Sequence, residues 1–219
     1  MADQASTTTK RATAGAPAPE SLNAAQRARR QRIVRSGLEL LESATYETIQ
    51  MRDVALAADV ALGTVYRYFP SKDHLFAAVL LEWAEPFATR VRHEPDPGRS
   101  DAERLVAALH RAMSAFEHRP QFFKLISVLQ VVAEPDVAAL YRRFTQLTQG
   151  VFAETLHDVP PEDVQDVVGL AGAVLDSVLR AWSLGQLTVA EAQDRLSRSV
   201  ALVFSPPPQR RRRSRATTA

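Results

Sequence analysis

The sequence predicts an all-α protein in which an N-terminal module of three helices precedes a larger helical body. Apolar residues recur at helical spacing through most of the 219 residues. No segment alternates apolar and polar residues as a half-buried strand does. Prolines 120, 135, 160 and 161 stand near predicted helix starts, where a missing N–H is tolerated. The pattern therefore predicts about nine helices in total.

The chain is predicted to have four parts. Residues 1–22 are small, polar and proline-containing, and residues 206–219 combine three prolines with an arginine cluster, so both are expected to be disordered tails. The arginine cluster is either a solvated tail or a source of non-specific phosphate contacts. Residues 23–71 are expected to form the N-terminal module and residues 72–205 the body.

The composition limits the classes of protein to which the chain can belong. Hydrophobic residues make up 46% of it, enough for a buried core. Cysteine is absent, which excludes disulfides and thiolate metal sites. No apolar run approaches the ~18–20 residues of a transmembrane helix, and the polar N-terminus does not resemble a signal peptide. We therefore expect a soluble cytoplasmic protein without a membrane partner.

The first helix is expected to begin near Asn23, where Gln26 completes a weak capping box. Ile33, Gly37 and Leu41 mark its buried face, together with Leu40. Its arginines lie on the early, exposed turns.

The segment Met51–Phe69 predicts two short helices joined by a turn. The apolar stripes consist of Met51, Val54, Ala55 and Ala58 in the first helix, and of Leu62, Val65 and Phe69 in the second, with Tyr66 at the edge. Between the helices, Asp59 tolerates the left-handed conformation that a tight reversal needs. Pro70 ends the second helix, and Ser71 caps the next one. Such a pair of helices is the helix-turn-helix unit, whose second helix faces DNA.

The face of the second helix opposite its apolar stripe is expected to contact DNA. At roughly 100° per residue, this face carries Gly63, Thr64, Arg67 and Tyr68. Gly63 permits a close approach, Thr64 offers a hydroxyl and a methyl group to a base, and Arg67 can reach a phosphate. The residues predicted to meet phosphates are Arg52, Tyr66, Arg67, Tyr68 and Lys72, and those predicted to meet bases are Leu62, Gly63 and Thr64.

Charge is segregated along the chain. Residues 24–72 carry a net charge of +3, residues 209–215 add five arginines, and residues 73–205 carry −6. A basic end and an acidic body indicate a polyanion as the partner of the basic end.

The body is predicted to contain six helices. The first runs from Lys72 to about Arg90 and connects the module to the body, with a kink expected at Pro86. The others are expected at Asp101–Glu117, Gln121–Ala133, Asp136–His157, Glu162–Leu184 and Val189–Phe204, after a loop at residues 93–100.

The run GTVYRYFPSKDHLF resembles the signature of the TetR family of bacterial repressors. The similarity covers about Asn23–Leu81, and it implies a homodimer that binds a palindromic operator and is released by a small effector. Asp59 departs from the pattern, because many members have glycine there. The wider string YETIQMRDVALAADVALGTVYRYFPSKDHL is similar to KstR-type members, which repress steroid (cholesterol) catabolism and respond to the CoA thioester of a steroid acid. The resemblance implies that residues 72–205 bind the ligand and dimerise.

The last two predicted helices are candidates for the dimer interface. The earlier of the two is apolar over much of its circumference, so it is expected to be buried on several sides. An internal core helix would satisfy the pattern, but we favour a four-helix interface between two copies. The predicted interface residues are Val174, Leu175, Val178, Trp182, Leu196, Val200 and Val203.

The middle helices concentrate large flat side chains that are candidates for an apolar ligand pocket. The predicted ligand-binding residues are Trp83, Phe87, Met113, Phe116, Phe123, Tyr141 and Phe144. Such a stripe is more often plain core, and the family resemblance favours the pocket. The expected ligand is large and apolar, either a steroid acyl-CoA, a fatty acyl-CoA or a hydrophobic drug.

An enzyme or an adaptor without a DNA role is the alternative from another class. The five histidines show no metal-ligand spacing, and no phosphate loop or nucleophile elbow is present. We therefore predict no catalytic residues, no metal and no cofactor.

Overall fold

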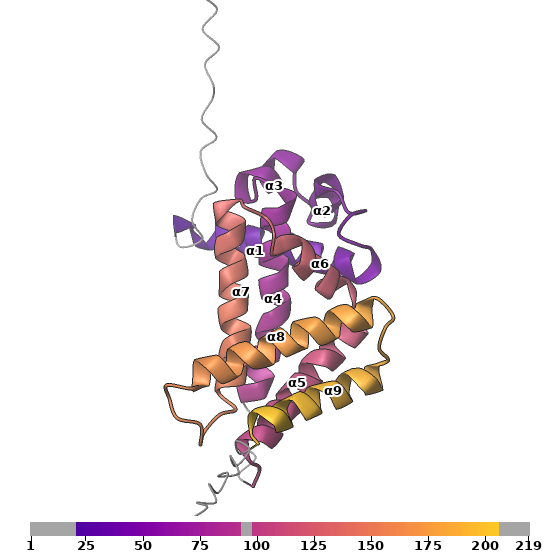
Figure 1. The fold of residues 1–219 in the computed structure, drawn as a ribbon. Helices are drawn as coiled ribbons and strands as arrows, with labels where there is room; N and C mark the ends of the chain where they lie inside the picture. Colours follow the sequence, from indigo (N-terminus) through magenta and orange to yellow (C-terminus); the bar gives the residue numbers. More distant parts are fainter. Residues whose placement is uncertain (1–20, 93–97, 206–219) are drawn as a thin grey trace, which may run out of the picture. The chain divides into compact units, whose positions relative to one another are not determined.

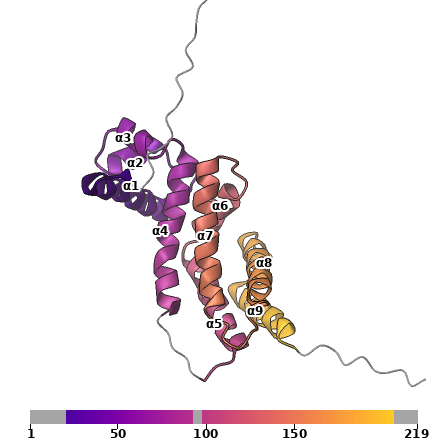
Figure 2. The ribbon, with the colours of Figure 1, turned by 90° about the vertical axis from the view of Figure 1, so that its left-hand side faces the viewer.

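The computed structural model describes residues 21–92 and 98–205, and every regular element in these ranges is a helix (Figures 1 and 2). The nine helices are α1 (Ala24–Ser43), α2 (Met51–Ala57), α3 (Leu62–Tyr68), α4 (Lys72–Arg92), α5 (Asp101–His118), α6 (Gln121–Leu129), α7 (Pro135–Ala153), α8 (Val164–Ser183) and α9 (Val189–Val203). The all-α class and the predicted number of helices are confirmed for these residues.

Several helix bounds differ from the predictions. α6 ends at Leu129 instead of Ala133, and α7 ends at Ala153 instead of His157. The predicted tails at 1–20 and 206–219 and the loop at 93–97 lie outside the described residues. Leu22, which was assigned to the N-terminal tail, is buried, so the packed part begins before α1.

The described chain forms two compact units. Unit 1 contains residues 21–83 and 124–144, and unit 2 contains residues 84–123 and 145–205, apart from 93–97. Unit 1 therefore includes the predicted N-terminal module, the first part of α4 and the separate segment 124–144. Within it, the first parts of α4 and α7 lie side by side in both views (Figures 1 and 2).

The start of α1 follows the predicted capping pattern. The backbone N–H of Gln26 donates to Oδ1 of Asn23 at 2.9 Å, and the N–H of Asn23 donates to Oε1 of Gln26 at the same distance. Two N–H groups that would lack helical partners are thereby satisfied.

α1 and α4 approach closely at Gly37. A Cβ atom built on Gly37 would lie 2.9 Å from Cγ2 of Val79. Ile33 and Leu41 on the same side of α1 are fully buried, as is Val79. A larger residue at position 37 would therefore have to displace Val79.

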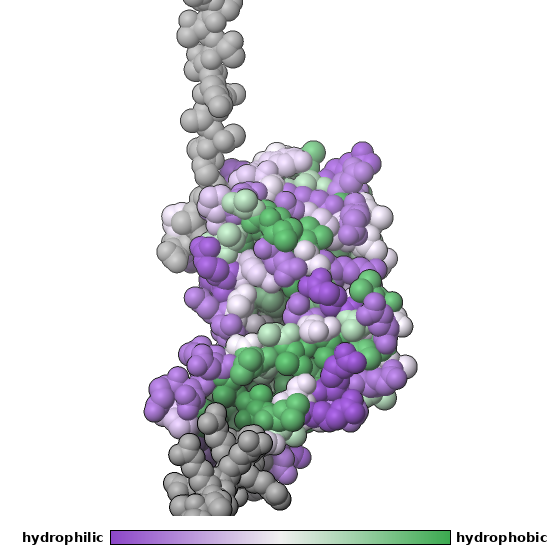
Figure 3. Space-filling model, in the orientation of Figure 1, coloured by the Kyte–Doolittle hydropathy of each residue, from purple (hydrophilic) through white to green (hydrophobic). Residues whose placement is uncertain are grey.

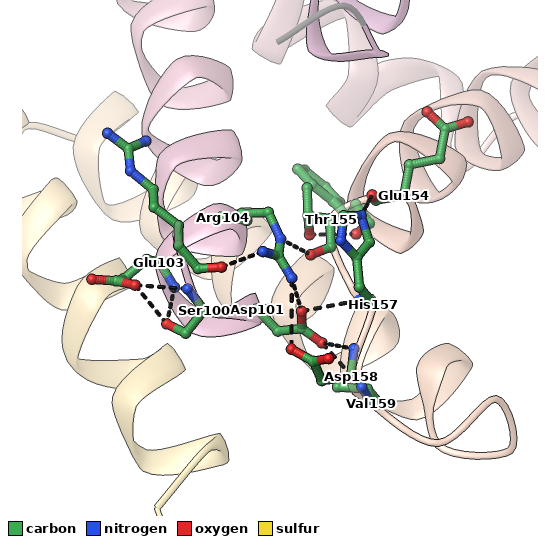
Figure 4. A network of polar contacts seen from close by, with 11 residues as sticks. Ser100, Asp101, Glu103, Arg104, Glu154, Thr155, His157, Asp158 and Val159 are labelled. Carbon is green, nitrogen blue, oxygen red and sulfur yellow. Dashed lines mark hydrogen bonds and ion pairs between the residues drawn. The ribbon is translucent and has the colours of Figure 1, made fainter. Parts of the chain in front are cut away.

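Unit 2 packs α5, α8 and α9 together, and a buried carboxylate holds the chain after α7 (Figure 4). Asp101 is 4% exposed and accepts hydrogen bonds from the backbone N–H groups of His157, Asp158 and Val159 at 2.8–3.0 Å. Arg104 forms an ion pair with Asp101, and its Nε donates to the carbonyl oxygen of Thr155 at 2.9 Å. The start of α5 is thus fixed to residues 155–159.

No helix in residues 21–92 and 98–205 combines the length and apolar character that crossing a bilayer requires.

Candidate DNA-binding site

The turn between α2 and α3 is closed by Asp59, which has a φ of +50°. The N–H of Val60 donates to the carbonyl of Ala55 at 3.0 Å, and the N–H of Asp59 donates to the carbonyl of Leu56 at 3.2 Å. These two bonds form a Schellman motif, in which the residue after the helix adopts the left-handed conformation. The conformation predicted for Asp59 is confirmed.

Arg32 of α1 attaches that turn to the rest of the module. Its Nε donates to the carbonyl oxygen of Ala58 at 3.1 Å. Ala58 is the C-cap of α2, so the arginine satisfies an end carbonyl of this helix. The turn that orients α3 is therefore fixed from α1 as well as by its own backbone.

α3 buries two of the three residues of the predicted stripe, together with one residue that was predicted to be exposed. Val65, Tyr68 and Phe69 are buried, whereas Leu62 is 41% exposed and Tyr66 is 47% exposed. Gly63 and Arg67 are also exposed. The exposed face therefore consists of Leu62, Gly63, Tyr66 and Arg67, with the half-buried Thr64 at its edge.

Two sequence assignments on α3 need correction. Leu62 was placed in the buried stripe as well as among the base contacts, and only an exposed position is observed. Tyr68 was predicted to reach a phosphate, but only 2% of its surface is exposed. The Arg67 guanidinium lies 5.1 Å from the Tyr68 ring centroid, and its Nη2 lies 3.4 Å from the Tyr68 hydroxyl. Tyr68 thus packs inside unit 1 and supports Arg67.

Lys72 is held against the loop between α1 and α2. Its Nζ lies 4.2 Å from the Tyr46 ring centroid and 3.5 Å from the carbonyl oxygen of Glu47, and the Tyr46 hydroxyl donates to Asp73. Burial lowers the pKa of Lys72, although the nearby acids oppose this shift. A phosphate-binding role stays a prediction for Lys72 and for Arg52, which is exposed on α2.

Phe69, directly after α3, lies between a cation and a histidine. The Arg30 guanidinium lies 4.8 Å from its ring centroid, and the His74 ring packs edge-on at 5.6 Å. Burial lowers the pKa of His74. Asp136 and Glu134 oppose this shift, and the smaller effect of Arg30 adds to it. A neutral imidazole is therefore favoured next to the guanidinium.

The seven residues predicted for the ligand pocket divide between the two units. Unit 1 holds Trp83, Tyr141 and Phe144, and unit 2 holds Phe87, Met113, Phe116 and Phe123. Ring centroids are 5.9 Å apart in the Tyr141–Phe144 pair and 6.1 Å apart in the Phe116–Phe123 pair. The pocket that would unite the seven side chains stays a prediction.

Four of the residues predicted for the dimer interface are buried in the single chain. Leu175, Val178, Leu196 and Val200 are at most 8% exposed, because they pack within unit 2. Leu196 and Val200 nevertheless line a groove at the surface of α8 and α9. The assignment of these four residues to the interface stays a prediction. Val203 is 42% exposed, and Val174 and Trp182 are partly exposed.

An apolar surface remains uncovered on α8 and α9 (Figure 3). We call it the α8–α9 face, and it consists of Val167, Leu170, Val174 and Val203. All four line a shallow groove, and Leu170 is 55% exposed. The predicted interface residues include Val174 and Val203 of this face, but they do not include Val167 and Leu170.

The polar groups of the described residues offer no metal site. No group of three or more His, Cys, Asp or Glu side chains in residues 21–92 and 98–205 is placed to hold a metal ion.

Comparisons with known proteins agree with this arrangement. A family model for bacterial regulatory proteins of the tetR family matches residues 33–79, and a model for the tetracyclin repressor-like C-terminal domain matches residues 98–203. The HTH-type transcriptional repressor KstR of Rhodococcus jostii is 34% identical over 82% of this chain and 84% of its own length. KstR of Mycolicibacterium smegmatis is 31% identical, over 82% of this chain and 89% of its own.

A solved structure shares the fold. The crystal structure of a TetR transcriptional regulator from Rhodococcus sp. RHA1 superposes with a TM-score of 0.68 and is 26% identical, covering 84% of this chain and all of that one.

Proposed function

This chain belongs to the TetR family of bacterial regulatory proteins, and from that membership we propose that it is a homodimeric repressor released from a palindromic operator by a bulky apolar effector. Its relatives are transcriptional regulators and not enzymes, so an enzymatic role is set aside.

The exposed face of α3 is the observation that carries the proposal. Leu62, Gly63 and Arg67 project away from the buried side of a helix whose turn is fixed by Asp59 and Arg32. A helix presented in this way fits the major groove of DNA. Leu62, Gly63 and Thr64 would meet base edges, while Arg52, Arg67 and Lys72 would neutralise phosphates.

The α8–α9 face supports the homodimer. Leu170 and Val203 expose apolar surface that a second copy would remove from water. A two-fold axis through one patch pairs it with itself, so a single face on the chain suffices. The two recognition helices would then lie about 34–36 Å apart, one turn of the duplex.

The proposed effector is a steroid-like acyl group carried as its CoA thioester. The similarity to KstR supports this class, and the aromatic side chains of α4, α5, α6 and α7 would suit a flat apolar body. α4 carries Lys72 in its first turn and Trp83 and Phe87 further along, so it could transmit the effect of a ligand. Full release requires a preference of about 5.5 kcal/mol between the two states. A fatty acyl-CoA or a hydrophobic drug is the alternative effector.

The test begins with selection of duplexes from a random pool by the full-length protein. The expected product is a palindrome whose two half-sites lie one helical turn apart. Thr64→Ala should weaken binding to this duplex by about 1–3 kcal/mol and leave random DNA unaffected. Lys72→Ala should weaken binding to the selected duplex and to random DNA alike. It should also lower the slope of log affinity against log salt concentration by about one. A pool that yields no common sequence would contradict the repressor function.

The same duplex identifies the effector class. A gel shift with steroid acyl-CoA, long-chain fatty acyl-CoA and a planar cationic drug should show release by the steroid thioester. Release by the drug alone would refute the steroid effector and leave the repressor function in place.

A further inference from the structure

The exposed face of α3 has an apolar side and a polar side. Leu62 and Tyr66 are four positions apart, so they lie one above the other along the helix. Thr64 and Arg67 lie toward the opposite edge of the exposed face, and Gly63 is between the two sides. We call Leu62 and Tyr66 the apolar ridge.

The apolar ridge is not part of the buried side of α3. Its two side chains are 41% and 47% exposed, while Val65, Tyr68 and Phe69 already supply the buried side of this segment. Leucine has no hydrogen-bonding group, so it cannot bind a phosphate or a polar base edge. Its burial against DNA is favourable only where the DNA itself is apolar.

The major groove offers one such surface. Base edges there present hydrogen-bond donors and acceptors, and thymine adds a C5-methyl group. Gly63 adds a second observation, because a Cβ built there would meet nothing within 4 Å and its φ is not in the left-handed region. Packing therefore does not require glycine at this position, although glycine weakens a helix. Its missing side chain leaves room for the groove edge between the two sides of α3.

We propose that Leu62 and Tyr66 read the C5-methyl groups of thymines in each operator half-site. This inference rests on the proposed operator binding and deepens it, since it makes methyl contact a source of sequence preference. It assigns Tyr66 to bases, whereas the sequence assigned it to phosphates. The hydroxyl of Thr64 and the guanidinium of Arg67 are then left for polar groups of the DNA.

The test compares thymine with uracil in the selected operator. Deoxyuridine keeps the hydrogen-bonding groups of thymidine and lacks only the methyl group. Binding of the full-length protein is measured by fluorescence anisotropy at fixed salt, first to the operator and then to the same duplex with deoxyuridine at every thymine of the half-sites. Each lost contact should weaken binding by about fourfold, from the value of one buried methylene-sized group.

Variants show whether the apolar ridge is responsible. Leu62→Ala should bind the thymine operator more weakly and lose most of the difference between the thymine and uracil duplexes. Tyr66→Ala should also reduce this difference. Leu56→Ala is the matched control, because Leu56 is a leucine of α2 that is 85% exposed and lies outside α3. Leu56→Ala should keep the wild-type ratio of affinities for the thymine and uracil duplexes.

Three outcomes would overturn the inference. One is a wild-type protein that prefers its operator and binds the uracil duplex equally well, which leaves the repressor function intact. Another is that Leu62→Ala and Tyr66→Ala keep the wild-type ratio of affinities for the thymine and uracil duplexes. DNA shape would then account for the weaker binding of the uracil duplex. Failure to select any operator would refute both this inference and the proposed function. Circular dichroism of each variant verifies that α3, which buries neither ridge side chain, remains folded.

Discussion

The hydroxyl of Ser71 donates a hydrogen bond to Oε2 of Glu134 at 2.8 Å, across 63 residues of sequence. The same Ser71 oxygen accepts the backbone N–H of His74 at 3.0 Å, as the N-cap of α4. Glu134 stands directly before Pro135, the first residue of α7. One hydroxyl group therefore connects the start of α4 with the start of α7 inside unit 1.

A double-mutant cycle should detect this connection. Ser71→Ala removes both the cap and the Glu134 bond, so it should lower the free energy of unfolding by about 1–2 kcal/mol. Glu134→Ala should cost less, because it leaves the cap in place. The two changes together should cost about 1 kcal/mol less than their sum, measured by urea unfolding. Glu134→Gln, which keeps an acceptor oxygen, serves as the control, and strict additivity would contradict the connection.

Gly63→Ala should separate stability from DNA binding. Alanine stabilises a helix by about 0.5–1 kcal/mol relative to glycine, and the added Cβ meets no atom within 4 Å. Unfolding should therefore require more urea, while operator affinity falls because the methyl group occupies the space left for DNA. Gly150→Ala in α7 is the matched control, since a Cβ there also meets nothing. It should leave operator affinity unchanged, and unchanged affinity in Gly63→Ala would show that α3 does not approach DNA at this residue.

The α8–α9 face should hold the dimer. Leu170→Asp places a charge on a residue that is 55% exposed, so the chain should fold and sediment as a monomer. Val178→Asp alters a side chain that is fully buried, so it should unfold the chain. The control is Val131→Asp, because Val131 is 77% exposed but lies in unit 1. A dimeric Leu170→Asp protein would exclude this face from the interface.

The Asp101 contacts should make stability depend on pH. Burial tends to raise the pKa of Asp101, but hydrogen bonds from His157, Asp158, Val159 and Arg104 outweigh it, so its pKa is lowered from the ordinary 3.8. The carboxylate therefore stabilises the fold above this pH, and its contribution is lost as the pH falls through the lower folded value. Thermal unfolding between pH 7 and pH 3 should show this loss.

Asp101→Asn tests the assignment. The variant should be less stable at pH 7 by roughly 3 kcal/mol, because Arg104 loses its buried partner. Its stability should also fall less steeply on acidification than that of the wild type. An equal slope in both proteins would assign the acid sensitivity to other carboxylates.

Local sequence signals predicted local structure well. The Asn23–Gln26 capping box and the left-handed Asp59 involve groups at most five residues apart, so the sequence contains all that determines them. The rotational phase of α3 was predicted less well. Seven residues make about two turns, too few for apolar spacing to decide between Leu62 and Tyr68 as the buried side chain.

Contacts between residues far apart in the sequence could not be predicted from such local patterns. The spacing of Val178 and Leu196 indicates burial but does not tell whether the cover comes from the same chain or from a second copy. Asp101 accepts hydrogen bonds from backbone N–H groups 56–58 residues away. Every residue except proline has such a group, so the residue types do not show which of them bind Asp101. The three-dimensional structure was needed to identify what covers Val178 and Leu196 and what binds Asp101.

The close approach of Gly37 and Val79 has a mechanical consequence. Where two helices touch through side chains, a sideways shift of one can be absorbed by new rotamers. Gly37 has no rotamer, and Val79 is a stiff β-branched residue that is fully buried against it. A displacement of this part of α4 is therefore passed directly to α1, and through Arg32 to the turn before α3. The first half of α4 and the three helices before it would therefore move together as one rigid body.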